Sequence, residues 1–272
     1  MAFNEELLKT LRTAELLPLR RVFQPGLRVL EIGGGNGWQA ALLSSWGCKV
    51  TSIDVDPVSD WTATYFPVMQ YDGRHIPFED RSFDVVFSSN VLEHVPHVYD
   101  LLIEMRRVLV PDGLAIHILP TPVWRFWTSM SHYLHVAQKG ISILRRWTTP
   151  GTAAGSDATR TRKTATYYLR KVTSAGPHGV SSSAARELID FSRRRWAREL
   201  ERAGYELAGT FPAGLFYTGF GVFPMLSIDM RQRLAKFLGS ACRVFIARPA
   251  PAKQAVGGTD KLPSCYPDGR FG

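Results

Sequence analysis

The sequence predicts an α/β fold, a mostly parallel sheet with helices on both faces. Short apolar strands alternate with helical segments through the first half of the chain, as in consecutive βαβ units. A glycine-rich turn directly follows the first of these strands. The 272 residues, 45% of them hydrophobic, suffice for one large domain with a sizeable core. In such sheets we expect the ligand at the carboxyl ends of the strands, where the strand order reverses.

The expected elements follow from apolar periodicity and turn residues. A helix over about Phe3–Arg12 opens the chain. The first half then holds strands at Arg28–Ile32, Lys49–Ile53, Val68–Gln70, Phe83–Ser88 and Leu114–Leu119, with helices at Trp38–Trp46 and His97–Leu109. The second half holds helices at Val123–Trp147, Ala184–Ala203 and Asp229–Leu238, a loop at Thr148–Ala158, and strands at Tyr205–Phe211 and Cys242–Ala247. We expect an N-terminal helical segment (1–27), a main domain (28–248) and a disordered tail (249–272).

The glycine turn has the sequence VLEIGGGNG over residues 29–37. A dinucleotide-binding turn needs a third glycine where this chain has Trp38, and an indole there would block close helix–strand packing. A phosphate-binding loop of the Walker type would need Gly-Lys-Ser/Thr, and neither Lys nor Ser/Thr follows Gly37. The turn therefore predicts a nucleoside ligand without a phosphate chain.

Composition excludes several other classes of protein. The three cysteines, Cys48, Cys242 and Cys265, are far apart, which fits neither a disulfide framework nor a metal-ligand spacing. No stretch reaches the ~20 apolar residues of a membrane span, and the N-terminus lacks the apolar core of a secretion signal. We therefore expect a cytoplasmic protein, with peripheral contact to the inner face of the membrane left open.

The net charge of +9 is concentrated in residues 121–183, which hold nine basic residues and one acidic residue. This asymmetry predicts either an anionic partner or a solvated face. The segment begins with an amphipathic helix pattern. Its apolar positions are Phe126, Met130, Tyr133, Leu134, Ala137, Ile141 and Leu144, and its polar positions are Arg125, His132, Lys139 and Arg146. The helix is interpreted first as a lid with its apolar face towards the core, and alternatively as a helix in a membrane interface with Trp124, Trp127 and Trp147 near the headgroups.

Four motifs follow one another in a defined order. They are VLEIGGGNG (29–37), TSIDVDP (51–57), YDGRHIPFEDRSFDVVFSSNVLEHV (71–95) and LLIEMRRVLVPDGLAIHIL (101–119). Together they resemble class I S-adenosylmethionine-dependent methyltransferases, in particular the small-molecule and quinone-pathway O-methyltransferases that share the Leu-Glu-His-Val element. The resemblance implies a Rossmann-like, seven-stranded sheet whose last strand is antiparallel, with residues 121–183 as a helical lid insertion. It also implies S-adenosylmethionine as the cofactor.

The resemblance assigns roles to individual positions. Asp54 ends the second strand and would accept hydrogen bonds from the ribose hydroxyls, with Val55 against the adenine. Asp72 and Gly73 would contact the adenine amino group and ring. Glu31, inside an apolar strand, needs a partner, and the methionine ammonium of the cofactor fits that need. The remaining expected contacts are Gly33, Gly34, Gly35 and Gly37 in the turn, and Ser89 and Asn90 near the transferred methyl group.

His94 is the candidate general base because imidazole titrates near neutral pH. A structural role for this histidine is the alternative. The seven histidines show no convincing metal-ligand spacing, and methyl transfer from a sulfonium requires no metal, so none is expected.

These features predict O-methylation of a small molecule or of a saccharide hydroxyl, free or lipid-linked. The saccharide rests on a further resemblance, of GPHGVSS and FSRRRWARELERAGYE, to bacterial methyltransferases of surface-glycan and other secondary pathways. RNA methylation by the basic insertion, with Tyr167 and Tyr168 for base stacking, is one alternative. A non-catalytic, cofactor-binding partner protein is another.

Overall fold

The computed structural model describes residues 5–57, 63–134, 176–219 and 223–251. Seven strands form one sheet in the order β3-β2-β1-β4-β5-β7-β6. The strands are β1 Arg28–Ile32, β2 Lys49–Asp54, β3 Val68–Gln70, β4 Phe83–Ser89, β5 Leu109–Pro120, β6 Tyr205–Pro212 and β7 Cys242–Pro249. Neighbours from β3 to β5 pair in parallel, and β7 pairs antiparallel with both β5 and β6. The expected mostly parallel sheet with an antiparallel last strand is confirmed.

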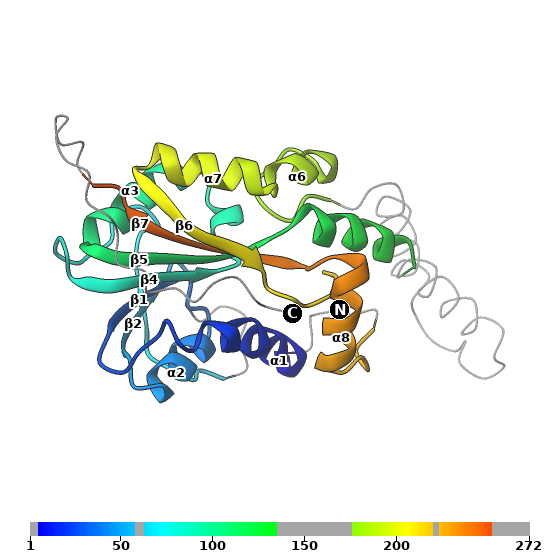
Figure 1. Ribbon diagram of the computed structural model, residues 1–272, viewed down its shortest axis with the longest axis horizontal. Helices are drawn as coiled ribbons and strands as arrows, with labels where there is room; N and C mark the ends of the chain where they lie inside the picture. Colours follow the sequence, from blue (N-terminus) through cyan, green and yellow to red (C-terminus); the bar gives the residue numbers. More distant parts are fainter. Residues whose placement is uncertain (1–4, 58–62, 135–175, 220–222, 252–272) are drawn as a thin grey trace, which may run out of the picture.

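Helices cover both faces of the sheet (Figure 1). The helices are α1 Glu5–Leu16, α2 Trp38–Ser45, α3 Val98–Val108, α6 Ala184–Asp190, α7 Arg193–Arg202 and α8 Ile228–Leu238, with short 3-10 turns η1 Leu17–Leu19 and η2 Leu92–His94. In Figure 1, α3, α6 and α7 lie on one side, and α1, α2 and α8 on the other. Each face has its own core: Leu102 and Trp196 belong to the first, and Leu11 and Phe23 to the second. None of the helices in the described ranges is long and apolar enough to cross a bilayer.

The expected helix Ala184–Ala203 is two helices. Phe191 lies between them, is 3% exposed and packs its ring 6.2 Å from that of Trp124. Ser192 then begins α7 as an N-cap, because its hydroxyl accepts a hydrogen bond from the Arg195 amide. The helical periodicity continues across the break, which is why the sequence pattern does not reveal it.

Residues 122–134 are helical, as expected for the start of Val123–Trp147, but the buried face is the reverse of the predicted one. Phe126, Met130, Tyr133 and Leu134 are exposed, whereas Arg125 and His132 are buried. The polar face is buried because it has partners in the fold: Arg125 forms an ion pair with Glu187, and the Thr128 hydroxyl accepts a hydrogen bond from the Gly219 amide. A lid with its apolar face on the core is therefore wrong for residues 123–134. The rest of the helix, loop 148–158 and nearly all of the tail lie outside the described residues.

Candidate functional site

The glycine turn connects β1 to α2 at the carboxyl edge of the sheet. Gly33 and Gly34 donate amide hydrogen bonds to the carbonyl of Ile53 at 2.8 and 3.2 Å, which ties the turn to the end of β2. Gly33 has φ of +78°, and a Cβ atom there would lie 2.2 Å from Val91 Cγ2. A Cβ atom on Gly34 would meet the Ser52 hydroxyl at 2.0 Å. Both positions therefore require glycine for packing, and Gly33 requires it for its conformation as well.

Gly37 has a different role from the other glycines of the turn. It is the N-cap of α2 with φ of +79°, and a Cβ atom there would lie 2.6 Å from the carbonyl oxygen of Phe66. Gly33, Gly34 and Gly35 line the adjacent cavity, whereas Gly37 is not among the lining residues. Its contact with the cofactor stays a prediction, and the requirement for glycine is explained by the close approach of Phe66.

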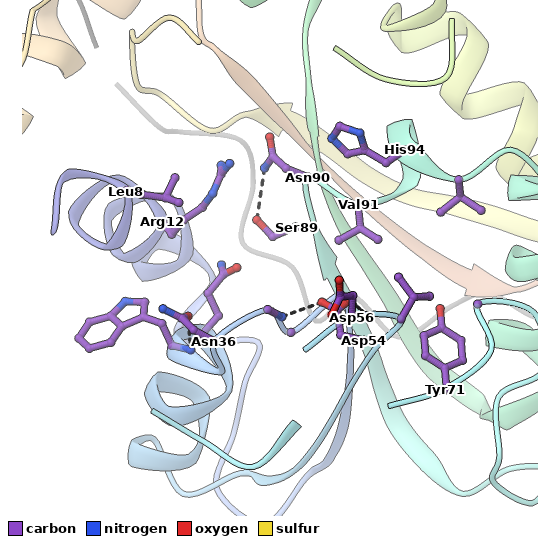
Figure 2. Close-up of a pocket in the computed structure, with 18 of the residues that line it drawn as sticks. Leu8, Arg12, Asn36, Asp54, Asp56, Tyr71, Ser89, Asn90, Val91 and His94 are labelled. Carbon is purple, nitrogen blue, oxygen red and sulfur yellow. Dashed lines mark hydrogen bonds between the residues drawn. The ribbon is translucent and has the colours of Figure 1, made fainter. Parts of the chain in front are cut away.

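Asp54 supports the turn from the end of β2. Its carboxylate accepts hydrogen bonds from the amide of Gly35 at 2.7 Å and from that of Asp56 at 3.1 Å (Figure 2). The side chain lines the cavity, as does Val55 beside it, which is half exposed. Asp54 therefore joins the loops after β1 and β2 at the position where the sequence predicts a ribose.

The cavity lies where the strand order reverses between β1 and β4, and it has a volume of about 690 Å³. This size is typical of a small-molecule site. One wall consists of the glycine turn and the loops after β2 and β3, with Asp54, Val55, Asp72 and Gly73. The other consists of the loop after β4 and helix α1, which contribute Ser89, Asn90, His94 and Arg12 (Figure 2). Of the predicted site residues, only Glu31 and Gly37 are not in the lining.

Glu31 lies beneath the glycine turn, 2% exposed. Its carboxyl accepts a hydrogen bond from the Ser52 hydroxyl at 2.6 Å. Burial raises the pKa of Glu31 to about 7, and the Ser52 hydrogen bond opposes that shift only in part. The sequence predicts the methionine ammonium of the cofactor as the partner of Glu31. The structure supplies Ser52 as a protein partner, and the ammonium contact stays a prediction.

Asp72 organises its own turn. One carboxylate oxygen accepts hydrogen bonds from the amides of Arg74 and His75, each at 2.7 Å, and the other lies 3.0 Å from the His75 ring nitrogen. The hydrogen bonds from His75 and Arg74 lower the pKa of Asp72 to about 2, so the group is ionised at neutral pH. Its side chain lines the cavity next to Tyr71, but its contact with an adenine amino group stays a prediction.

Helix α1 adds a basic side chain that sequence reasoning missed. Arg12 Nη1 donates hydrogen bonds to Glu15 at 2.7 Å and to the Tyr217 hydroxyl at 3.0 Å. With the amide of Asn90 turned so that its oxygen faces α1, that oxygen accepts a hydrogen bond from Arg12 Nη1 at 2.7 Å. Asn90 itself has φ of +54°, a left-handed conformation that asparagine adopts more readily than most other non-glycine residues. Residues before the first strand offered no motif that would have indicated this contact.

His94 ends η2 at the cavity wall, with 44% of its side chain exposed. Its Nε2 atom lies 3.8 Å from the carboxylate of Glu93, whose side chain is fully buried. The ring of His178 packs against that of His94 with 4.6 Å between centroids. Burial lowers the pKa of His94 and lowers that of His178 to about 4, so both imidazoles are neutral at pH 7. His178 was missed because it is remote from His94 in sequence and belongs to no local motif.

Known proteins resemble the chain over the region that builds this cavity. Residues 30–117 match the methyltransferase domain family. An uncharacterised methyltransferase of Mycobacterium sp. (strain KMS) is 38% identical over 133 residues, 44% of this chain and 51% of that protein. One from Mycobacterium tuberculosis is 35% identical over 132 residues, with the same coverage of each chain. The chain thus spans about half the length of the curated relatives it matches.

Solved structures are similar at lower identity. An S-adenosylmethionine-dependent methyltransferase from Mesorhizobium loti is 19% identical, and the match covers 88% of this chain and 99% of that chain with a TM-score of 0.47. A didemethyltoxoflavin N1-methyltransferase from Burkholderia thailandensis, crystallised with S-adenosylhomocysteine, is 14% identical, with 89% and 78% coverage and a TM-score of 0.48. The matched domain, the curated relatives and the seven-stranded sheet agree with the four sequence motifs. Residues 30–117 therefore carry a methyltransferase domain, and the seven-stranded sheet around it has the fold of the class I S-adenosylmethionine-dependent methyltransferases.

Proposed function

We propose that the protein transfers the methyl group of S-adenosylmethionine to a hydroxyl of a small molecule or saccharide. The observation that carries this proposal is the cavity between the β1 and β4 loops. The wall formed by the loops after β1, β2 and β3 presents the glycine turn and two carboxylates, Asp54 and Asp72, which are suited to ribose and adenine. The opposite wall presents Ser89, Asn90 and His94, whose polar groups can form hydrogen bonds with an acceptor.

The chemistry asks little of the protein beyond alignment. The sulfonium methyl group is already activated, so the acceptor oxygen attacks it in line while the carbon–sulfur bond breaks and the electron pair goes to sulfur. Most of the rate acceleration comes from aligning the two reactants and from excluding water. His94, as a neutral imidazole open to the cavity, is suited to take the hydroxyl proton.

Incubation with radiolabelled methyl donor and a cell lysate fractionated into lipid, saccharide and RNA pools tests this proposal. Label in the saccharide or lipid pool, lost with Asp54→Ala, is the expected result. Label confined to the RNA pool would favour the alternative, in which the basic residues at 160–171 contact phosphates; those residues lie outside the described ranges. Cofactor binding without label in any pool would favour a non-catalytic partner protein.

An exposed apolar surface supports a lipid-borne acceptor or a membrane contact. Helix 122–134 and α8 meet where the Trp127 indole donates a hydrogen bond to the Leu238 carbonyl at 3.1 Å. Around this contact, Phe126 is 47% exposed and Phe237 is 87% exposed. The same two helices also expose Met130 and Met230, and the exposed basic residues on α8 are Arg233 and Lys236. Large apolar side chains beside basic ones fit an anionic lipid surface.

A further inference from the structure

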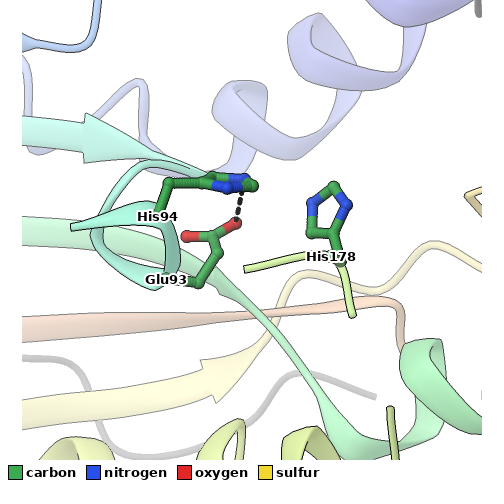
Figure 3. Close-up of side chains that lie close together, drawn as sticks. All are labelled: Glu93, His94 and His178. Atoms are coloured by element: carbon green, nitrogen blue, oxygen red, sulfur yellow. Dashed lines mark ion pairs between the residues drawn. The ribbon is translucent and has the colours of Figure 1, made fainter. Parts of the chain in front are cut away.

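The carboxylate of Glu93 is buried, and it lies 3.8 Å from His94 Nε2 without a hydrogen bond. Its side chain is fully inaccessible, and neither oxygen has a hydrogen-bond partner within the described ranges. A buried carboxylate is costly unless a cation or a hydrogen-bond donor compensates it. The groups that face it are the imidazoles of His94 and His178 (Figure 3). One ligand atom from each of the three side chains lies within 4.8 Å of the others.

The loop that carries His178 is held by a buried acidic side chain. One carboxylate oxygen of Glu187 accepts hydrogen bonds from the amides of His178 at 2.6 Å and of Gly179 at 2.7 Å. The other oxygen lies 3.2 Å from Arg125 Nε, in an ion pair whose two side chains are 2% and 0% exposed. Arg125 also donates to the carbonyl of Gly176 at 3.0 Å. Two buried charges thus fix the backbone on both sides of His178.

The same loop is also fastened to the Glu93 backbone. The amide of Val180 donates to the carbonyl of Glu93 at 3.0 Å. A Cβ atom on Gly179 would lie only 2.3 Å from that carbonyl, so the close approach requires glycine. The ring of Trp124 packs 4.7 Å from that of His178 and limits its rotation. The fold therefore holds His178 next to Glu93 and His94, although the His178 imidazole forms no hydrogen bond with the Glu93 carboxylate.

We propose that Glu93, His94 and His178 bind a divalent transition-metal ion, with Zn²⁺ as the representative case. Two imidazoles and one carboxylate are the ligand set of catalytic zinc sites that keep a fourth position open, and related sets hold iron. Bond lengths of about 2.0–2.2 Å place tetrahedral ligand atoms roughly 3.4 Å apart. The 3.8 Å between His94 Nε2 and Glu93 Oε1 is close to that spacing, and the three ligand atoms, which lie within 4.8 Å of one another, would have to move closer together to bind the ion. This proposal departs from the sequence-based expectation of no metal, which the structure does not test.

The role of the ion rests on the proposed function. His94 lines the cavity, so an ion that it binds would lie next to the space assigned to the acceptor. A hydroxyl bound there has a lowered pKa and releases its proton to solvent. The resulting oxygen anion forms the new bond to the methyl carbon as the carbon–sulfur bond breaks, and sulfur keeps the electron pair. The site thus supplies the deprotonation that the neutral His94 would otherwise perform.

Metal binding to tag-free protein, stripped with a chelator, tests the site without any turnover. Titration calorimetry with Zn²⁺ should show one equivalent per chain, and Co²⁺ should give the visible absorption bands of a four- or five-coordinate site. Glu93→Gln and His178→Ala should each weaken binding by more than about 100-fold, since loss of a direct ligand exceeds the effect of losing an outer-shell partner. His97→Ala, an exposed histidine three residues from His94, is the matched control and should bind normally.

Folding of the variants is checked by their affinity for S-adenosylmethionine, because none of the three proposed metal ligands is among the predicted cofactor contacts. The proposal is overturned if the wild-type protein takes up no stoichiometric Zn²⁺ or Co²⁺, or if folded Glu93→Gln and His178→Ala bind the ions as tightly as wild type. Unchanged methyl transfer in the metal-free protein would remove the catalytic role and leave the proposed function intact. Stoichiometric metal binding without methyl transfer to any acceptor would support the metal site and contradict the proposed function.

Discussion

The guanidinium of Arg125 and the carboxylate of Glu187 form an ion pair at 3.2 Å inside the protein. Arg125 comes from helix 122–134 and Glu187 from α6, so the pair joins the start of the insertion to the second half of the chain. It explains why the polar face of helix 122–134 is buried. It also positions the loop at 176–180, because Glu187 accepts hydrogen bonds from two amides of that loop.

Glu187→Gln should destabilise the protein by about 3 kcal/mol, because removing one partner leaves a buried, uncompensated charge on the other. Chemical denaturation followed by circular dichroism measures the change. Arg186→Ala is the matched control: it breaks the more exposed ion pair with Asp190 on the same helix and should cost less than ~1 kcal/mol. Equal losses in the two variants would contradict the structural importance of the buried pair.

Asp54→Ala should abolish S-adenosylmethionine binding measurable by calorimetry. The change removes the predicted ribose acceptor and also the 2.7 Å hydrogen bond that orients the Gly35 amide. Asp112→Ala, an exposed aspartate on β5 away from the cavity, serves as the control and should bind like wild type. Wild-type affinity in Asp54→Ala would mean that the ribose is bound elsewhere.

Glu31 should make stability depend on pH in the cofactor-free protein. Its folded-state pKa of about 7 lies above the ordinary 4.5, so its contribution is complete below about pH 4.5 and is lost as the pH rises through 7. The difference corresponds to about 3 kcal/mol. Glu31→Gln should therefore flatten the decline in unfolding free energy between pH 5 and pH 8. A slope as steep as that of wild type would assign the pH dependence to other groups.

The exposed apolar surface should bind anionic lipid. The protein should co-sediment with vesicles that contain phosphatidylglycerol, and a smaller fraction of it should co-sediment with vesicles of phosphatidylcholine alone. Replacing Phe126 and Phe237 with serine should reduce binding several-fold. Met69→Ser, at an exposed position on β3, should leave it unchanged. Binding that is insensitive to both phenylalanines would show that this surface has another partner.

Local signals predicted most of the sheet and the inner wall of the cavity. The bounds of β1 and β3 agree with the prediction, because apolar strands ending at glycine or Asp-Gly turns leave a clear pattern. Asp54 and Asp72 were found because each lies at or just beyond the end of a strand. Arg12, Glu187 and His178 were missed because their roles come from tertiary contacts between segments far apart in sequence.

The insertion shows why amphipathicity alone misleads. The pattern at Phe126, Met130, Tyr133 and Leu134 correctly indicates a helix, but periodicity cannot tell which face the rest of the protein covers. The ion pair between Arg125 and Glu187 is buried, so the polar face of helix 122–134, and not its apolar face, packs against the protein. Glu187 lies far from Arg125 in the sequence, so a local sequence pattern does not reveal it as the partner.

Calorimetric titration of the wild-type protein with S-adenosylmethionine, and in parallel with NAD⁺, tests the central claim most directly. We predict binding of one S-adenosylmethionine per chain and no binding of the dinucleotide, because the turn at Gly33–Gly37 leads into Trp38 where a diphosphate would need glycine. A protein that binds NAD⁺ and ignores S-adenosylmethionine would contradict the account.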